Sequence, residues 1–71
     1  MSCAAEVWNA FEAGRTEGVR DHVENLRAFN NVLDPRVSIE NKQQALETLR
    51  KNQFKKTADA LETWLKCVTS T

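Results

Sequence analysis

At 71 residues the chain has room for one small domain with little core per residue, so we expect a second chain, a metal or a cross-link to support it. Ten Lys or Arg balance ten Asp or Glu, which excludes a uniformly basic or acidic protein. The charges are uneven, because residues 1–34 hold three Arg and six acids whereas residues 35–71 hold seven Lys or Arg and four acids. No run approaches the roughly 20 apolar residues of a membrane span, and Glu6 interrupts the apolar run that a signal peptide needs. We expect a soluble, intracellular protein with no membrane partner.

The first predicted element is a helix over about residues 3–32, because helix-favouring residues are abundant and Gly and Pro are rare. Ser2 can cap its start. Gly14 and Gly18 weaken this helix, so a break between them is the main alternative. Pro35 ends it, since Pro lacks an N–H and forces the preceding residue out of the helical region.

A turn at about residues 33–37 leads to a second predicted helix over about residues 37–68, with Asp34 or Ser38 as its N-cap. Both helices are amphipathic, and a short turn between them predicts an all-α single domain, a long antiparallel helical hairpin in which residue numbers that sum to about 71 lie side by side. A lone hairpin leaves its apolar stripes exposed to water, so we expect a homodimer that forms a four-helix bundle. The predicted core and dimer interface consists of Trp8, Phe11, Val19, Leu26, Phe29, Leu46, Phe54, Leu61, Trp64 and Leu65.

Catalysis and metal binding have little support in the sequence. No Ser-His-acid or Cys-His grouping, Gly-rich phosphate loop or paired-cysteine metal spacing is present, so we expect no enzyme, no cofactor and no metal site. His22 is a lone histidine on the apolar face and is expected to pack in the core. Cys3 and Cys67 meet at the open end of the hairpin. Free thiols in a reducing compartment are expected, with a disulfide as the alternative.

Four basic side chains fall within the seven residues RKNQFKK, from Arg50 to Lys56. Helical geometry turns Arg50 inward, and the hairpin register predicts that it pairs with Asp21. Lys51 and Lys55 turn outward, onto a face that combines point charges with amide and hydroxyl groups and so suits phosphates and ribose hydroxyls. A solvated lysine-rich helix face is the competing interpretation. The candidate RNA-binding residues are Lys51, Asn52, Lys55, Lys56, Lys66, Thr48, Arg20 and Arg27.

Several positions together resemble one viral family. The opening Met1-Ser2-Cys3-Ala4, the junction Asp34-Pro35-x-Val37, and Ala45, Gln53 and Leu65 make the chain similar to the small RNA-silencing suppressors of nodaviruses over nearly its whole length. The resemblance implies a helical antiparallel dimer in the host cytoplasm that binds double-stranded RNA lengthwise, without sequence preference, and shields it from dicing. It also implies that the second helix supplies most RNA contacts, which adds Lys42 to the candidates. Asp59 departs from the pattern, because it stands where the resemblance predicts a basic residue.

The alternative function is a small helical protein interaction module. Trp8, Phe11 and Trp64 would then anchor another polypeptide through an exposed part of the apolar stripe, and the lysines would keep the domain in solution. A protein partner in the silencing machinery is compatible with either interpretation.

Overall fold

The computed structural model of the protein describes residues 3–70, and every regular element in that range is helical, which confirms the all-α prediction. The described elements are α1 (Ala4–Glu17), the short 3-10 helix η1 (Val19–Asp21), α2 (Val23–Leu33), α3 (Ile39–Lys51) and α4 (Lys55–Thr69).

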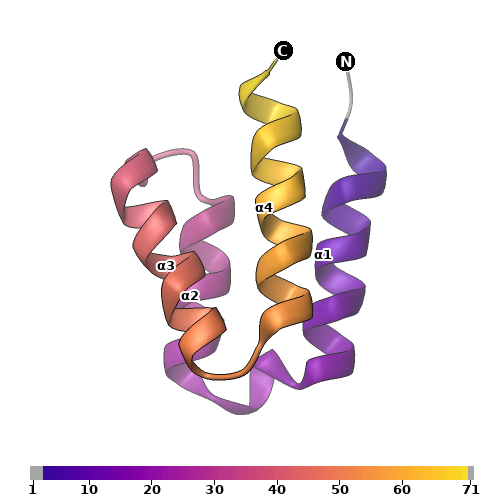
Figure 1. Ribbon diagram of the computed structural model, residues 1–71, viewed down its shortest axis with the longest axis vertical. Helices are drawn as coiled ribbons and strands as arrows, with labels where there is room; N and C mark the ends of the chain where they lie inside the picture. Colours follow the sequence, from indigo (N-terminus) through magenta and orange to yellow (C-terminus); the bar gives the residue numbers. More distant parts are fainter. Residues whose placement is uncertain (1–2, 71) are drawn as a thin grey trace.

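The helices alternate in direction, so that both ends of the chain lie at one end of the molecule and η1 and the α3–α4 turn lie at the other (Figure 1). α1 packs along α4 and α2 packs along α3, while α3 also contacts α4. The longest dimension is 32 Å, which is shorter than the roughly 45 Å of an unbroken helix over residues 3–32. Each of the two expected helices is divided, and the four antiparallel helices come from a single chain.

The first division falls at Gly18, within the interval offered as the main alternative to a continuous helix. Gly18 adopts the left-handed conformation with φ 80°, and its N–H donates to the carbonyls of Gly14 and Arg15. A side chain is strained in that conformation, whereas glycine adopts it readily. α1 therefore ends there, and η1 turns the chain back into α2.

The second division falls at residues 52–54, where a continuous helix over residues 37–68 was expected. Gln53 has φ 74° although it is not a glycine. The Gln53 N–H donates to the Arg50 carbonyl at 3.1 Å, and the Phe54 N–H donates to the Leu49 carbonyl at 2.8 Å. These two bonds form the Schellman arrangement that ends a helix, and burial of the Phe54 side chain supplies the apolar contact that usually accompanies it. The prediction failed because the segment contains neither Gly nor Pro.

The structure around Pro35 agrees with the turn and the N-cap predicted from the sequence. α2 ends at Leu33, and the Ser38 hydroxyl accepts a hydrogen bond from the Asn41 N–H at 3.2 Å, so Ser38 is the N-cap of α3. Asp34 instead pairs with Arg36. The predicted cap Ser2 lies outside the described residues.

The core lies where the four helices meet. Six predicted core residues are buried, namely Val19, Phe29, Leu46, Phe54, Leu61 and Leu65, and Leu26 and Trp64 are half-buried. His22, also expected in the core, is exposed.

Trp8 and Phe11 lie outside the core of the single chain, because 64% and 45% of their surfaces are exposed, and their predicted place in a dimer interface stays a prediction. α1 buries its small residues Ala10 and Gly14 instead. A Cβ on Gly14 would lie 3.2 Å from the Phe29 ring, so this glycine leaves room for the Phe29 side chain to pack against α1.

Glu17, at the end of α1, caps the start of α4. Its carboxylate accepts hydrogen bonds from the backbone N–H groups of Lys56 and Thr57 and from the buried Thr57 hydroxyl, at 3.3, 2.7 and 2.7 Å. α4 has no acidic residue in its own first turn, and its N-cap Phe54 has no capping side chain. The first N–H groups of α4 are therefore satisfied from a neighbouring helix.

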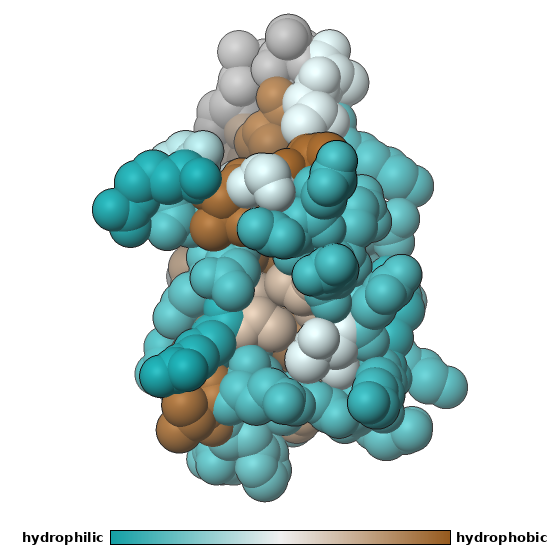
Figure 2. Space-filling model, turned by 90° about the vertical axis from the view of Figure 1, so that its left-hand side faces the viewer, coloured by the Kyte–Doolittle hydropathy of each residue, from teal (hydrophilic) through white to brown (hydrophobic). Residues whose placement is uncertain are grey.

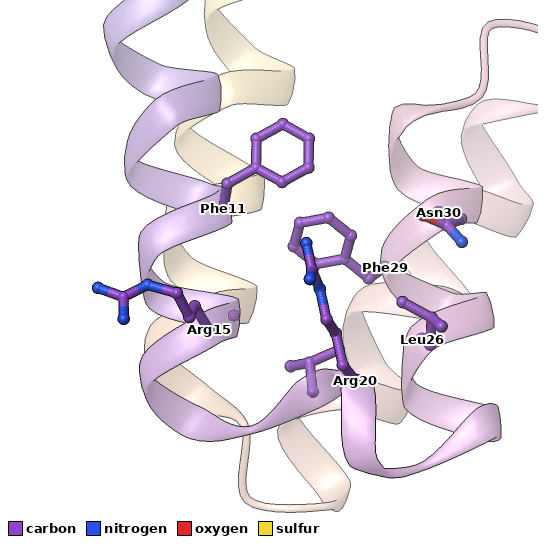
Figure 3. Close-up of a pocket in the computed structure, with 8 residues that line it drawn as sticks. Phe11, Arg15, Arg20, Leu26, Phe29 and Asn30 are labelled. Atoms are coloured by element: carbon purple, nitrogen blue, oxygen red, sulfur yellow. The ribbon is translucent and has the colours of Figure 1, made fainter.

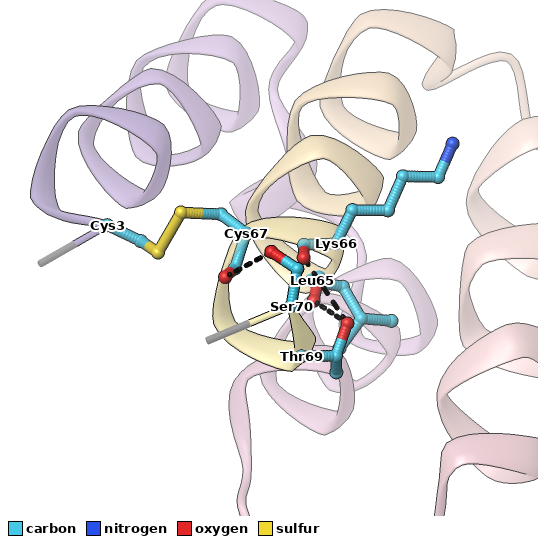
Figure 4. The surroundings of a disulfide bond; sticks show 6 residues. All are labelled: Cys3, Leu65, Lys66, Cys67, Thr69 and Ser70. Carbon is cyan, nitrogen blue, oxygen red and sulfur yellow. Dashed lines mark hydrogen bonds between the residues drawn. A yellow bond between two sulfur atoms is a disulfide. The ribbon is translucent and has the colours of Figure 1, made fainter. Parts of the chain in front are cut away.

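Cys3 and Cys67 form a disulfide that joins the start of α1 to the last turn of α4 (Figure 4), with 6.1 Å between their Cα atoms. The hairpin register correctly predicted that they lie close together, but the expectation of free thiols is corrected.

None of the described helices is long and apolar enough to span a membrane.

Replacing both cysteines, Cys3→Ser with Cys67→Ser, is expected to lower the free energy of unfolding by about 2–4 kcal/mol, because the cross-link spans 64 residues of chain. Urea denaturation without reductant measures the difference. In the presence of a thiol reductant the two proteins should denature alike. Equal stability without reductant would show that the bond does not constrain the unfolded chain.

Candidate nucleic-acid interface

Half of the ten basic side chains are held by other groups of the protein. Among residues 3–70, acidic partners lie within ion-pair distance of Arg15, Arg36, Arg50 and Lys66, and Lys42 is held by backbone carbonyls. The basic residues with no ion pair in that range are Arg20, Arg27, Lys51, Lys55 and Lys56. All five were predicted RNA-binding residues.

Three of these five residues flank the α3–α4 turn. Lys51 is the last residue of α3, Lys55 and Lys56 are the first two residues of α4, and all three are exposed. We name these three residues the basic turn. It lies at the end of the molecule remote from the chain ends (Figure 1). Bringing three cations together in one short turn concentrates positive potential on a neutral protein.

A polar groove of about 570 Å³ runs between α2 and α3. Arg27 and Thr48, both predicted RNA-binding residues, line it together with the amide side chains of Asn31, Asn41 and Gln44. The apolar residues that also line it are Val23, Ala28, Val37 and Ala45. Glu24 is its one acidic lining residue, and its carboxylate accepts a hydrogen bond from Asn52. Figure 2 shows this side of the molecule as mainly hydrophilic, with a paler strip along its middle. Since Lys51 lies one turn beyond Thr48 on α3, the groove leads toward the basic turn.

Two predicted contacts are partly engaged within the protein. The Asn52 side-chain amide donates to Glu24 and Asn25, both at 2.8 Å, and so ties the α3–α4 turn to the start of α2. The Thr48 hydroxyl donates to the Gln44 carbonyl at 3.1 Å but retains its capacity to accept. Asn52 therefore positions the basic turn, and its NH₂ group is not free for a ligand.

Lys42 is buried, which corrects its assignment to the RNA-binding face. Its ammonium donates to the carbonyls of Val32 and Asp34 at 2.6 Å and of Asn31 at 3.4 Å. α2 has no basic residue in its own last turn, so a side chain from α3 satisfies its final carbonyls. Desolvation lowers the pKa of Lys42, while the charge of Asp34 acts in the opposite direction.

Arg50 pairs with Asp59 and Glu62, and not with Asp21 as predicted. The short α3–α4 turn places Arg50 beside the first turns of α4. In a continuous helix those turns would lie further along the axis, out of reach of the Arg50 side chain. Glu62 also lies near Lys66, so this third lysine of α4 is partly neutralised. The hydrogen bond from Arg50 lowers the pKa of the Glu62 carboxyl. Asp59, which departed from the family pattern, therefore belongs to an ion-pair cluster between α3 and α4.

Arg20 stands apart from the other four unpaired cations. It lines a cavity of about 90 Å³ between α1 and α2, together with Phe11, Val19, Leu26 and Phe29. In Figure 3 its side chain extends beside Phe29, whereas Arg15 points away from the cavity. The rings of Phe11 and Phe29 are 5.4 Å apart. The five basic residues without an ion pair are thus divided between the basic turn, the α2–α3 groove and this aromatic cavity.

Comparison with protein families, with curated proteins and with solved structures found no match for this chain.

Replacing Lys42 by Met is expected to lower the free energy of unfolding by about 1–3 kcal/mol, because buried carbonyls at the end of α2 lose their donor. Urea denaturation followed by circular dichroism measures the change. Lys55→Met is the matched control, since an exposed lysine should change the value by no more than about 0.5 kcal/mol. If the two variants are equally stable, the capping role of Lys42 is wrong.

Proposed function

We propose that the protein binds double-stranded RNA without sequence preference, shields it from dicing and thereby suppresses RNA silencing. The observation that carries this proposal is the basic turn, where Lys51, Lys55 and Lys56 are exposed and their ammonium groups form no ion pair among residues 3–70. The resemblance to nodavirus suppressors points to the same ligand and to the host cytoplasm as the place of action.

The chemistry of the neighbouring groove favours RNA as the ligand. Phosphate contacts supply affinity without sequence information, which is the role that we assign to the basic turn and to Arg27. The minor groove of an RNA duplex is wide and displays ribose 2′-hydroxyls, which both donate and accept hydrogen bonds. Asn31, Asn41 and Gln44 line the groove with side chains that can do the same. This combination suits recognition of the shape of a duplex.

The ligand surface in this proposal leaves out Lys66, which the sequence placed among the candidate RNA-binding residues. Lys66 lies eleven residues beyond Lys55 on α4, about 16 Å along the axis, and it is near Glu62. We therefore assign the phosphate contacts to Arg27, Lys51, Lys55 and Lys56. One chain offers four cations in this arrangement, and two chains would offer eight.

We also propose that two chains associate, as the sequence and the family resemblance suggested. The exposed surfaces of Trp8 and Phe11 on α1 support this, because neighbouring apolar side chains are the usual material of an interface. A dimer would double the cations available to one duplex and lengthen the surface beyond the 32 Å of one chain.

The variant Lys51→Ala with Lys55→Ala is expected to weaken binding to an RNA duplex of about 16 base pairs or longer by at least about tenfold, because charge-assisted hydrogen bonds to phosphates are lost. Fluorescence anisotropy over a range of salt concentrations measures this. The log–log salt slope should be about −3 to −4 per bound chain, and the variant should reduce its magnitude by about 2.

Lys66→Ala is the matched control, since it removes a lysine of α4 that is already near a carboxylate. It should bind RNA nearly as well as the parent. Single-stranded RNA and a DNA duplex of the same sequence test the preference for an RNA duplex, and a dicing reaction with and without the protein tests shielding. Equal failure to bind all three nucleic acids at low salt would rule out the proposed function.

A second candidate function is docking onto another polypeptide, such as a component of the silencing machinery. The exposed Trp8 and Phe11 favour it, because Trp is enriched among the residues that dominate binding energy at interfaces. Trp8 and Phe11 could contact either a second copy of the chain or a different protein. Measuring the oligomeric state distinguishes self-association from docking onto another protein.

Trp8→Ala is expected to weaken self-association by about 2 kcal/mol or more, roughly 30-fold, and to leave the stability of the single chain within about 0.5 kcal/mol, because its side chain is 64% exposed. Sedimentation equilibrium measures the first quantity and urea denaturation the second. Val23→Ala is the control, since Val23 is an exposed apolar residue of α2. If the parent protein is monomeric at micromolar concentration, the proposed self-association is wrong, and docking onto another polypeptide is the remaining role for Trp8.

A further inference from the structure

We propose that Cys3, Glu6 and Cys67 bind one Zn²⁺ ion when the disulfide is reduced. One ligand atom from each of the three residues lies within 4.8 Å of the other two. Two of the residues come from the start of α1 and one from the end of α4, so the ion would join the same two helices as the disulfide. This inference is independent of RNA binding.

The ligand set suits zinc. Thiolates are soft ligands that select zinc over calcium and magnesium, and Zn²⁺ sites with three protein ligands complete a tetrahedron with water. Each of the two cysteines would supply a thiolate, and Glu6 would supply a carboxylate oxygen. Sequence spacing alone excluded a zinc site because Cys3 and Cys67 stand at opposite ends of the chain.

Glu6 is the observation that distinguishes this site from an ordinary disulfide. It lies one turn after Cys3 on α1, half-buried, and among residues 3–70 no hydrogen bond or ion pair occupies its carboxylate. A disulfide makes no use of a neighbouring carboxylate, whereas a metal ion requires a third ligand. Cys3 also stands at the N-terminus of α1, where the helix dipole stabilises negative charge such as that of a thiolate.

The backbone accommodates both states. The two cysteine Cα atoms are 6.1 Å apart, and the helices that carry them pack against one another along their length. Figure 4 shows the two side chains meeting across the gap between α1 and α4. A small separation of the two sulfurs after reduction therefore leaves them on opposite sides of one ion, without rearrangement of either helix.

The chemical steps are balanced by a thiol reductant. A dithiol gives two electrons and two protons to the disulfide, so the S–S bond breaks, two thiols form, and the dithiol becomes a cyclic disulfide. Zn²⁺ then displaces both thiol protons into solution and forms two Zn–S bonds. In an oxidising compartment the disulfide joins α1 to α4, and in a reducing compartment the metal ion does so.

The test uses Co²⁺ as a visible probe of the zinc site. The full chain is reduced, freed of excess reductant under anaerobic conditions, and titrated with Co²⁺. We expect thiolate-to-cobalt charge-transfer absorption that saturates at one ion per chain and disappears when Zn²⁺ is added. The oxidised chain should give no such absorption, and Mg²⁺ in excess should not compete.

Three variants assign the ligands. Cys67→Ser should abolish the thiolate absorption of the saturated site or reduce it by about half, with a large loss of affinity. Glu6→Gln should weaken Zn²⁺ binding by at least about tenfold, since even groups that only support a ligand change affinity by about 10- to 100-fold. Glu12→Gln is the matched control, because Glu12 lies on the same helix and pairs with Arg15, and it should bind as the parent does.

Circular dichroism of each reduced protein shows whether the helices remain, so loss of binding is not confused with unfolding. A reduced parent chain that binds no Co²⁺ overturns the proposal whether or not it stays folded. Binding that Cys67→Ser leaves unchanged also overturns it, and so does a stoichiometry of one ion per two chains by native mass spectrometry. Unchanged binding by Glu6→Gln overturns the assignment of the third ligand. Failure of RNA binding leaves each of these outcomes unaffected.

Discussion

Short helices that end against one another must satisfy their terminal backbone groups, and this structure does so with charged side chains from neighbouring helices. Glu17 at the end of α1 accepts from the first N–H groups of α4, and Lys42 of α3 donates to the last carbonyls of α2. Each charge is placed at the helix end whose dipole favours it. These two contacts tie α1 to α4 and α2 to α3, the two pairs from which the bundle is built.

This use of charge inside the bundle determines which cations remain for a ligand. Lys42 donates to the last carbonyls of α2 and so is not available to a ligand. Arg50 joins α3 to α4 through Asp59 and Glu62. Asn52 connects the α3–α4 turn to α2. The three lysines of the basic turn, Lys51, Lys55 and Lys56, take no part in these contacts and are exposed. A chain of zero net charge can thus present a local cationic surface, because most of the chain's acidic side chains pair with other groups of the bundle and not with these lysines.

Much of the fold could be predicted from local chemistry. The helix boundary at Pro35, the Ser38 cap and the amphipathic faces follow from short-range rules, and the antiparallel register placed Cys3 near Cys67. The end of α3 could not, because Gln53 adopts a glycine-like conformation that no residue type in the segment signals. Lys42 was misassigned for a different reason, since burial of a lysine depends on carbonyls that another helix brings to it. In the candidate site, the spacing of Asn41, Gln44 and Thr48 on α3 could have revealed the groove face, but the contribution of α2 required the tertiary structure.

The bond between Cys3 and Cys67 makes the oxidised chain close to a ring, because it joins residues 64 positions apart near the two ends. A mechanical load applied to those ends would pass through the sulfur atoms and leave α2, α3 and the basic turn unloaded. Without the bond the same load would act on the packing between α1 and α4 and would separate these two helices first.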